Sequence, residues 1–388
     1  MASVVLQGIT WGHSRGITPL MAASQRYSEL HPGVEICWKK RTLQEFADFP
    51  IEKLTEAYDL LIIDHPWVGC AAATNCVLPL NEYLSKEYLQ DQAENSVGNS
   101  HQSYNYNNKQ WALAIDAAAP AASFRKDLLD KNNMALPQKW QDVISLAEKG
   151  KVAVPAIPID MLMNFYSFCI AHGNAPFKSD EEVVDMETGL QAIATMKELY
   201  ALVDKKMFNY NPIAVAELMS ATDDFWYSPF AYCYSNYSRK GYAKKVLHYA
   251  GVVSLNDNQL QTTMGGTGLA VSAFSKHAAT AVDFTQWIVS AEMQRTFYVQ
   301  HSGQPGHRAA WMDEDANQLT NNFFKNILPV MDNSYTRPRY HGYLHFQDHA
   351  GLPLQKCIMQ NTNPATTLQA MNIIYQQSLL HKKNRIAV

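Results

Sequence analysis

The sequence predicts an α/β protein with more than one domain, and two observations carry this prediction. Strand and helix patterns alternate over the first 64 residues, which is typical of a doubly wound sheet with parallel strands. The chain has 388 residues, and a typical domain length of about 150 residues then gives two or three domains. Apolar residues make up 47% and charged residues 18%, which is a globular composition.

Charge and hydropathy exclude several classes of protein. The net charge is −4, and no basic run occurs beyond the tail HKKNR, so we expect no nucleic-acid partner. No stretch approaches the roughly 20 apolar residues that cross a bilayer. The start MASVVLQGITW lacks the basic and apolar regions of a signal peptide. Either the protein has no signal, or the chain begins at the mature residue behind an added Met.

Cysteine and histidine spacing gives no metal site, and we expect neither a metal nor a cofactor. Cys70 and Cys76 are the one close cysteine pair, and their spacing is not CxxC. A disulfide between them is compatible with the sequence but not required, and buried free thiols are the simpler interpretation. His341, His345 and His349 recur every four residues, which would place them on one face of a helix. Gly342 and the preceding Pro338 argue against a regular helix there.

The elements follow from hydrophobic periodicity. In the first third, we predict strands at 4–11, 34–41, 58–64 and 111–115, and helices at 17–30, 43–57 (broken at Pro50) and 78–92. A polar loop covers 94–110, and a crossing at 116–120 leads into a further helix. Next come helices at 136–150, 161–173 and 189–204, a short buried strand at 151–158, and an aromatic-rich run at 211–238. A strand at 268–272 precedes a helix, a turn-rich link covers 301–311, and the mostly helical end is interrupted at 334–351.

Two of the early strands end on polar side chains. Trp11, Gly12 and His13 close the first strand, and Asp64 and His65 close the third. Because ligands of such sheets bind beyond the carboxyl ends of the strands, both groups are expected at one ligand site.

An ordered series of motifs resembles the extracellular solute-binding proteins of sugar ABC transporters, and more narrowly the maltose-binding-protein-like family 1. The strongest motif is GGTGLAVSAFSKHAATAVDFTQWIVSAEMQRTF at 265–297. Other matching segments are SQRYSELHPGVEI, YDLLIIDHPWVG, KQWALAIDAAAPAASFRKDLLDK and SGQPGHRAAW. The series spans nearly the whole chain in the family's order. The missing signal peptide is the main departure.

The resemblance implies a two-lobed periplasmic-binding-protein fold of type II. Each lobe is a doubly wound sheet flanked by helices, and several strands form the hinge. Lobe 1 is expected at 1–115 and 266–305, and lobe 2 at 116–265 and 306–388. The lobes close on a ligand held between them, and the closed form docks on the membrane subunits of an ABC permease. A monomer in the periplasm or outside the cell is implied, or in the cytoplasm if Met1 is the native start.

The predicted ligand residues of lobe 1 suit a sugar, which offers an apolar face and a rim of hydroxyls. Trp11 can cover the face, while His13 and Arg15 can donate to the rim. The alternative is a Trp in the core and a solvated Arg. Asp64 and His65 either contact ligand or, for Asp64, cap the next helix. Asp116 at the crossing either contacts ligand or ties the hinge backbone.

The remaining ligand candidates come from later in the chain. Trp226 and Tyr227, within an aromatic-rich run, are candidates for stacking on the other face of the sugar. Gly266 and Thr267 form a close-approach loop whose backbone N–H groups can meet a ligand, since no Lys-Ser/Thr follows for a phosphate loop. His307 and Arg308 follow a turn at the second crossing. Arg15 and Arg308 together leave an acidic sugar open.

The leading function is therefore a non-catalytic receptor that delivers a carbohydrate or sugar derivative to an ABC importer. The alternative is an intracellular sugar-binding sensor or enzyme on the same scaffold, because fold does not fix function. His13, Asp64, His65 and Asp116 could supply acid and base groups. No nucleophile motif such as GxSxG occurs, and we expect no catalytic residue.

Overall fold

The computed structural model describes residues 3–42 and 51–383. The chain divides into two compact units. Unit 1 comprises 1–118, 265–332 and 339–341, and unit 2 comprises 119–264, 333–338 and 342–388. The division differs from the expected one chiefly at 306–332, and also at 339–341, because both segments belong to unit 1 and not to lobe 2. The segment 306–332 packs in unit 1, because Arg308 donates from Nε to the Ser96 carbonyl oxygen and the Gly98 N–H donates to Asp332.

Unit 1 is built on a five-stranded sheet with the order β2-β1-β3-β12-β6. β1, β2 and β3 are parallel, while β12 runs antiparallel to both β3 and β6. The strands are β1 (Val4–Trp11), β2 (Val34–Arg41), β3 (Leu60–Ile63), β6 (Leu113–Ala118) and β12 (Gly265–Val271). The sequence predicted β1 and β2 with these bounds, because both alternate clearly and end at turn residues.

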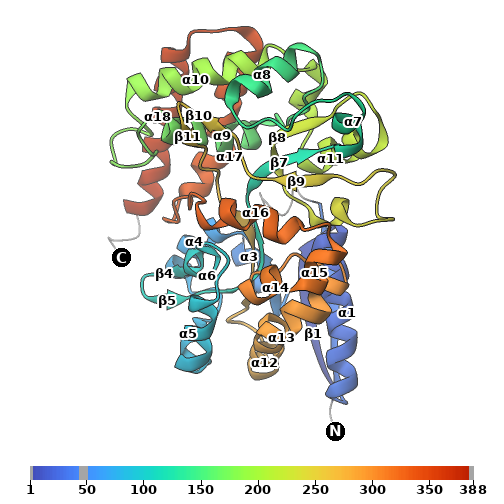
Figure 1. Ribbon diagram of the computed structural model, residues 1–388. Coiled ribbons are helices and arrows are strands. Elements are labelled where there is room, and N and C mark those ends of the chain that lie inside the picture. The colour runs from blue at the N-terminus through green and yellow to red at the C-terminus, as the bar shows by residue number, and fades with distance from the viewer. Residues whose placement is uncertain (1–2, 43–50, 384–388) are drawn as a thin grey trace. The chain divides into compact units, whose positions relative to one another are not determined.

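Helices α1 (Ser14–Leu30) and α12 (Ala278–Val289) contribute to the same core as this sheet (Figure 1). Tyr27 of α1 lies edge-on to Phe284 of α12, with ring centroids 5.2 Å apart. Leu20, Ala23 and Tyr27 of α1 are buried, as the helical period predicted. Further helices of unit 1 are α3 (Ile51–Thr55), η1 (His65–Trp67), α4 (Val68–Thr74), α13 (Ala291–Met293), the π-helical η5 (Gln294–Tyr298), α14 (Arg308–Met312), α15 (Glu314–Leu319) and α16 (Phe323–Asp332).

The helix expected at 78–92 is instead η2 (Leu80–Glu82) followed by α5 (Lys86–Glu94), because the Ser85 hydroxyl caps a new helix at the Tyr88 N–H. The expected loop at 94–110 contains α6 (Ser100–Ser103) and a small hairpin, β4 (Asn105–Tyr106) with β5 (Lys109–Gln110). Of the helix expected at 43–57, residues 43–50 lie outside the described residues.

Unit 2 differs from the doubly wound sheet expected for it. Its main sheet has three antiparallel strands in the order β8-β7-β9: β8 (Tyr227–Tyr232), β7 (Pro120–Phe124) and β9 (His248–Ala250). The prediction of a short strand at 151–158 is wrong, because within this segment only Val152 forms a β-bridge, with Tyr227. A small hairpin joins β10 (Ser254–Leu255) to β11 (Asn258–Gln259).

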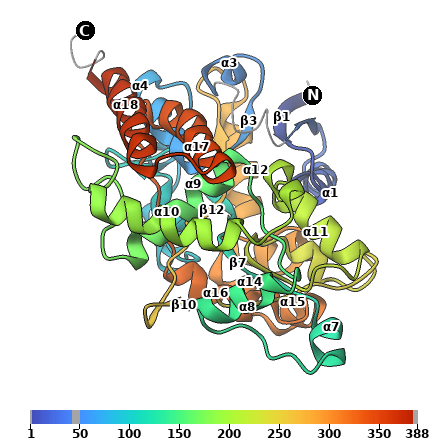
Figure 2. The ribbon, with the colours of Figure 1, turned by 90° about the horizontal axis from the view of Figure 1, so that it is seen from above.

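Helices make up most of unit 2. They are α7 (Lys126–Lys131), α8 (Trp140–Glu148), α9 (Pro158–Ala171), α10 (Met186–Tyr200), η3 (Lys205–Asn209), α11 (Pro212–Ala221), η4 (Ser235–Ser238), α17 (Tyr343–Gln360) and α18 (Pro364–Lys383). α17 and α18 pack side by side (Figure 2). The non-helical interruption expected at 334–351 ends earlier than predicted, because α17 begins at Tyr343. Gly342, with φ +108°, directly precedes this helix. No helix in 3–42 and 51–383 combines the length and hydropathy of a membrane span.

Candidate functional site

The topology of unit 1 gathers polar residues at one edge of its sheet. β1, β3 and β6 all run toward this edge, and the antiparallel β12 begins there. Eight of the predicted ligand residues lie on these strand ends or just beyond them: Trp11, His13, Arg15, Asp64, His65, Asp116, Gly266 and Thr267. Residues so distant in sequence come together because the carboxyl ends of the parallel strands β1, β3 and β6 lie at the same edge of the sheet.

A buried ion pair lies at this edge. Arg15, in the first turn of α1, donates from Nε to Asp116 Oδ2 at 2.8 Å and from Nη2 to Oδ1. The two residues are only 4% and 1% exposed. Burial raises the pKa of Asp116, while the guanidinium of Arg15 opposes that rise. The planar fork of Arg fits a carboxylate with two parallel hydrogen bonds, which orients both groups.

His13 is neutral and orients the start of α1. It is the N-cap of the helix, and its Nδ1 accepts a hydrogen bond from the Arg15 N–H at 3.0 Å. Burial, and then the charge of Arg15, lowers the pKa of His13 to about 4. Because Nδ1 accepts, the proton of the neutral ring resides on Nε2, which is a donor.

Thr267 stands opposite Asp116 in the pairing of β12 with β6. Its side chain is buried, and its hydroxyl has no hydrogen-bond partner among the described residues. Gly266 has φ +97°, and an added Cβ would lie 2.4 Å from the Asp116 carbonyl oxygen. Gly266 therefore permits the close approach of β12 to β6, and a ligand contact through its backbone N–H stays a prediction.

Trp11 belongs to the core of unit 1. It is 4% exposed, within a cluster that includes Leu20 and Tyr27. Its ring lies against Gly16, where a Cβ would come within 2.5 Å of it. A larger residue at position 16 would clash with the Trp11 ring. This packing favours a core role for Trp11 over stacking on a sugar.

Asp64 and His65 interact with each other. Asp64 is the N-cap of η1 and accepts from the His65 N–H at 2.8 Å, and its Oδ1 lies 3.2 Å from His65 Nδ1. The Asp64 side chain is 19% exposed and that of His65 is 1% exposed, edge-on to Tyr104. Asp64 therefore has the capping geometry that sequence reasoning gave as its alternative role.

His307 and Arg308 make structural contacts within unit 1. Arg308 donates from Nη1 and Nη2 to Asp332, and from Nε to the Ser96 carbonyl oxygen. His307 caps α14 through the Ala309 N–H, and its Nε2 lies 3.5 Å from Asp91 Oδ2. Burial lowers the pKa of His307. These contacts show a structural role for both residues, and their predicted ligand role stays a prediction.

The two aromatic candidates of unit 2 differ in exposure. Tyr227 is fully buried in β8, and its hydroxyl has no hydrogen-bond partner among the described residues, so a stacking role is corrected to a core role. Trp226 is partly exposed; its Nε1 donates to the Asp223 carbonyl oxygen, and Lys151 Nζ lies 5.0 Å from its ring centroid. Trp226 therefore remains a candidate.

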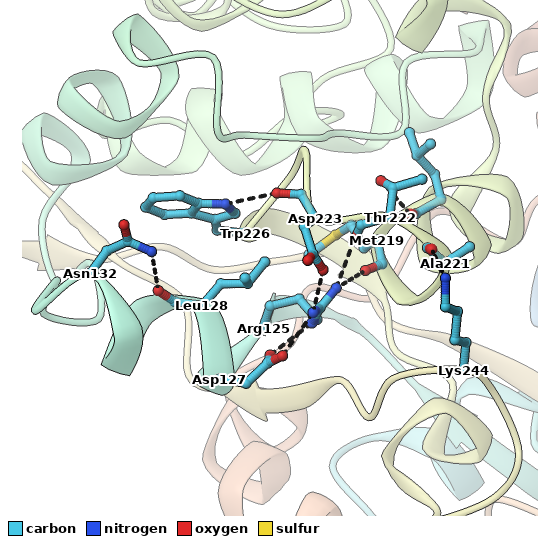
Figure 3. Close-up of polar contacts among 11 residues, drawn as sticks. Arg125, Asp127, Leu128, Asn132, Met219, Ala221, Thr222, Asp223, Trp226 and Lys244 are labelled. Atoms are coloured by element: carbon cyan, nitrogen blue, oxygen red, sulfur yellow. Dashed lines mark hydrogen bonds and ion pairs between the residues drawn. The ribbon is translucent and has the colours of Figure 1, made fainter.

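Sequence reasoning missed the most completely satisfied charged group of unit 2 (Figure 3). Arg125 has a fully buried side chain, and its Nε and Nη2 donate to Asp127 at 2.7 Å each. Nη2 also donates to Asp223, and Nη1 donates to the carbonyl oxygens of Met219 and Thr222. All five N–H groups of the guanidinium are thus used. No local pattern reveals this network, because three partners lie on a distant segment.

No metal cluster is found at this edge among the described residues. A cavity of about 360 Å³ in unit 1 is lined by none of the predicted ligand residues. Over 3–42 and 51–383, no three His, Cys, Asp or Glu side chains are grouped so as to hold a metal ion.

Asp160, in the first turn of α9, is a second group that sequence reasoning missed. It is 6% exposed, and its Oδ2 has no hydrogen-bond partner among the described residues. Burial raises the pKa of Asp160 to about 8. A carboxylic acid in such surroundings favours its neutral form.

We expect Asp160 to make stability depend on pH. Because its folded-state pKa is raised, its contribution is fully present below about pH 4 and is lost as the pH rises through 8. Asp160→Asn keeps the shape without the charge, so the variant should gain melting temperature over wild type as the pH increases from 4 to 9. The same difference in melting temperature at every pH would contradict this assignment. Asp185→Asn is the matched control, because the pKa of Asp185 is lowered.

Comparisons with known proteins give a family and a fold. The sequence profile of the bacterial extracellular solute-binding protein family matches residues 16–295. The maltose-bound MalE3 of T. maritima is similar in structure, with a TM-score of 0.84, 16% identity, and coverage of 97% of this chain and 100% of that one. A ribitol-bound ABC transporter solute-binding protein from Agrobacterium radiobacter K84 is similar with a TM-score of 0.82 and 17% identity, and the match covers 97% of this chain and 99% of that one. The acarbose-binding GacH receptor of Streptomyces glaucescens is similar with a TM-score of 0.79 and 17% identity, and the match covers 98% of this chain and 99% of that one.

Proposed function

Because the chain belongs to the bacterial extracellular solute-binding protein family, we propose that it is the substrate-binding component of an ABC importer. Its ligand in this proposal is a carbohydrate or sugar derivative. The similar solved structures hold maltose, ribitol and acarbose, which are hydroxyl-rich molecules. The family also supports a location outside the cytoplasmic membrane and an ABC permease as partner.

The observation that carries the sugar proposal is the chemistry of the unit 1 edge. Arg15 supplies donors, Asp116 supplies acceptors, and the Thr267 hydroxyl can do both. Sugar hydroxyls also donate and accept, so a mixed and buried set of this kind complements them. We propose Arg15, Asp116, Thr267 and His13 as ligand residues of unit 1, with Asp64 and His65 beside them and Trp226 as the aromatic contact from unit 2.

The ion pairs favour a neutral sugar over an acidic one. Arg15 is paired with Asp116, and Arg308 is paired with Asp332. Neither guanidinium therefore contributes an uncompensated positive charge to the edge. An acidic ligand would add a negative charge beside Asp116, which like-charge repulsion disfavours.

In this proposal the two units close on the ligand and release it unchanged, as a monomer without enzymatic activity. A ligand favours a closed state only by the free energy that it gains there. Small-angle scattering should then show a smaller radius of gyration on ligand addition. An unchanged radius with a sugar that demonstrably binds would contradict closure.

A ligand panel tests the proposal. The protein is unfolded and refolded to remove carried-over ligand, and its melting temperature is recorded with neutral mono- and disaccharides, sugar alcohols and acidic sugars. A ligand at 100 times its Kd adds about 2.7 kcal/mol of stability, which appears as several degrees. We expect a shift with a neutral sugar. A shift only with acidic sugars would overturn the neutral assignment, and no shift with any member would overturn the sugar assignment.

A further inference from the structure

The segment 303–306, between η5 and α14, lies alongside β6 in unit 1. Asp116 forms an antiparallel bridge with Pro305 on this side and pairs with β12 on the other. The Ala117 N–H donates to the Gln304 carbonyl oxygen at 3.2 Å, and Gln304 Nε2 donates to the Ala117 carbonyl oxygen at 2.8 Å. The backbone around Asp116 is therefore fixed from both sides.

Gln294 holds this segment from the buried side of η5. It is fully buried, its Oε1 accepts from the Gly306 N–H at 2.8 Å, and its Nε2 donates to the Ile288 carbonyl oxygen of α12 at 3.2 Å. The Gly306 N–H also lies 3.2 Å from the Ile115 carbonyl oxygen of β6. A glutamine meets both demands because its amide carries an acceptor and a donor. Gln294 thus links α12 to the segment that borders Asp116.

The π-helical turn η5 places both of its end residues on the buried side. Gln294 and Tyr298 are buried, while Arg295 between them is exposed. The Tyr298 ring lies against Gly303, where an added Cβ would come within 2.2 Å of the ring, and the Gly303 N–H bonds to the Tyr298 carbonyl oxygen at 2.9 Å. π-helical turns are rare and frequently occur at functional sites. Both ends of this turn therefore fix the segment 303–306.

We propose that Gln294 is a positioning residue of the ligand site, because it fixes 303–306 against β6 and so holds Asp116 in the orientation that pairs with Arg15. The inference rests on the proposed sugar site at the unit 1 edge. Gln294 acts through Gly306 and the backbone of Asp116 and does not itself contact the sugar. Arg15 and Asp116 are joined by two parallel hydrogen bonds, so a small shift of β6 weakens both bonds at once. Groups that contact a ligand keep their geometry only when the contacts behind them are fixed.

Gln294→Met tests the proposal, since it nearly keeps the side-chain volume and removes both hydrogen bonds. We expect the variant to bind the sugar found by the ligand panel about tenfold more weakly in calorimetric titration. The matched control is Gln92→Met. Gln92 of α5 is also buried and donates to the Val289 carbonyl oxygen at 3.3 Å, so this control loses a bond at the same end of α12 and should keep wild-type affinity. Equal losses of affinity in the two variants would overturn the positioning role.

The NMR signal of the Arg15 Nε–H group tests the same claim without a ligand. The signal is identified by its absence from the spectrum of Arg15→Lys, and it reports the bond to Asp116. We expect Gln294→Met to shift this signal and to speed its exchange with solvent, and Gln92→Met to leave it unchanged. An unchanged signal in Gln294→Met would contradict the proposal at any affinity. If no sugar binds, the receptor proposal fails, and this measurement still decides the positioning role.

Gln294→Glu is the second variant, used if Gln294→Met does not fold. A neutral carboxyl keeps an acceptor for Gly306 and an O–H donor for Ile288, whereas a carboxylate has no donor. Because burial favours the neutral form, we expect near wild-type affinity and an unshifted Arg15 signal at about pH 5, and a loss of both at about pH 8. Each value is compared with wild type at the same pH. The same difference from wild type at both pH values would contradict the role of the two bonds.

Discussion

Asp116→Ala is expected to destabilise unit 1 by about 3–5 kcal/mol and to abolish ligand binding, because it leaves Arg15 as a buried charge without its carboxylate. It also removes the acceptor that we assign to the sugar hydroxyls. Denaturant unfolding reports the first effect, and calorimetric titration with the sugar identified by the panel reports the second. Asp116→Asn should show both effects, since an amide cannot make the charged, two-bond contact with Arg15.

A double variant separates structure from binding at this pair. Arg15→Met with Asp116→Leu replaces the buried ion pair by apolar side chains, a change that is often neutral for stability. We expect the double variant to regain most of the lost stability and to remain unable to bind sugar. Wild-type affinity in this variant would show that the pair is only structural, and the ligand site would have to lie elsewhere.

Arg125→Met is expected to destabilise unit 2 by about 2–4 kcal/mol without changing sugar affinity. The substitution removes five hydrogen bonds at once and leaves the carbonyl oxygens of Met219 and Thr222 without their donor. The exposed carboxylates of Asp127 and Asp223 can turn to water, which limits the cost. The midpoint of denaturant unfolding measures the loss.

Two further substitutions make the Arg125 test specific. Arg125→Lys keeps the charge but has three donors and no planar fork, so most of the stability should still be lost. The adjacent Lys126 forms only an exposed pair with Asp130, and Lys126→Ala should change stability by less than about 1 kcal/mol. Equal effects at positions 125 and 126 would contradict the role given to the buried network.

The sequence was most informative where local pattern and topology agree. The β1–α1–β2 segment was predicted closely, because its strands alternate and Pro32-Gly33 ends the helix. Strand direction predicted that the ends of the first and third strands lie at one edge, and the parallel pairing of β1 with β3 confirms it. The meeting of Arg15 with Asp116 at this edge was not predicted from strand direction.

Long-range contacts explain the errors. β7 was missed because Ala-rich 117–122 has little strand propensity and is ordered by pairing with β8 and β9. The Arg308–Asp332 pair was not predicted, because its two residues lie 24 positions apart and no local pattern links them. The packing of the Trp11 ring against Gly16 was not predicted, because it depends on the space that a residue without Cβ leaves for the ring. In each case the contact is with a residue that hydrophobic periodicity and motif spacing cannot identify.

Titration of the ligand-free protein with the sugar that raises its melting temperature, followed by recovery of that sugar, is the most direct test of the receptor function. The predicted result is saturable binding of one sugar per chain, with the recovered sugar chemically unchanged. Absence of binding across neutral sugars, sugar alcohols and acidic sugars, or recovery of a chemically altered sugar, would contradict it.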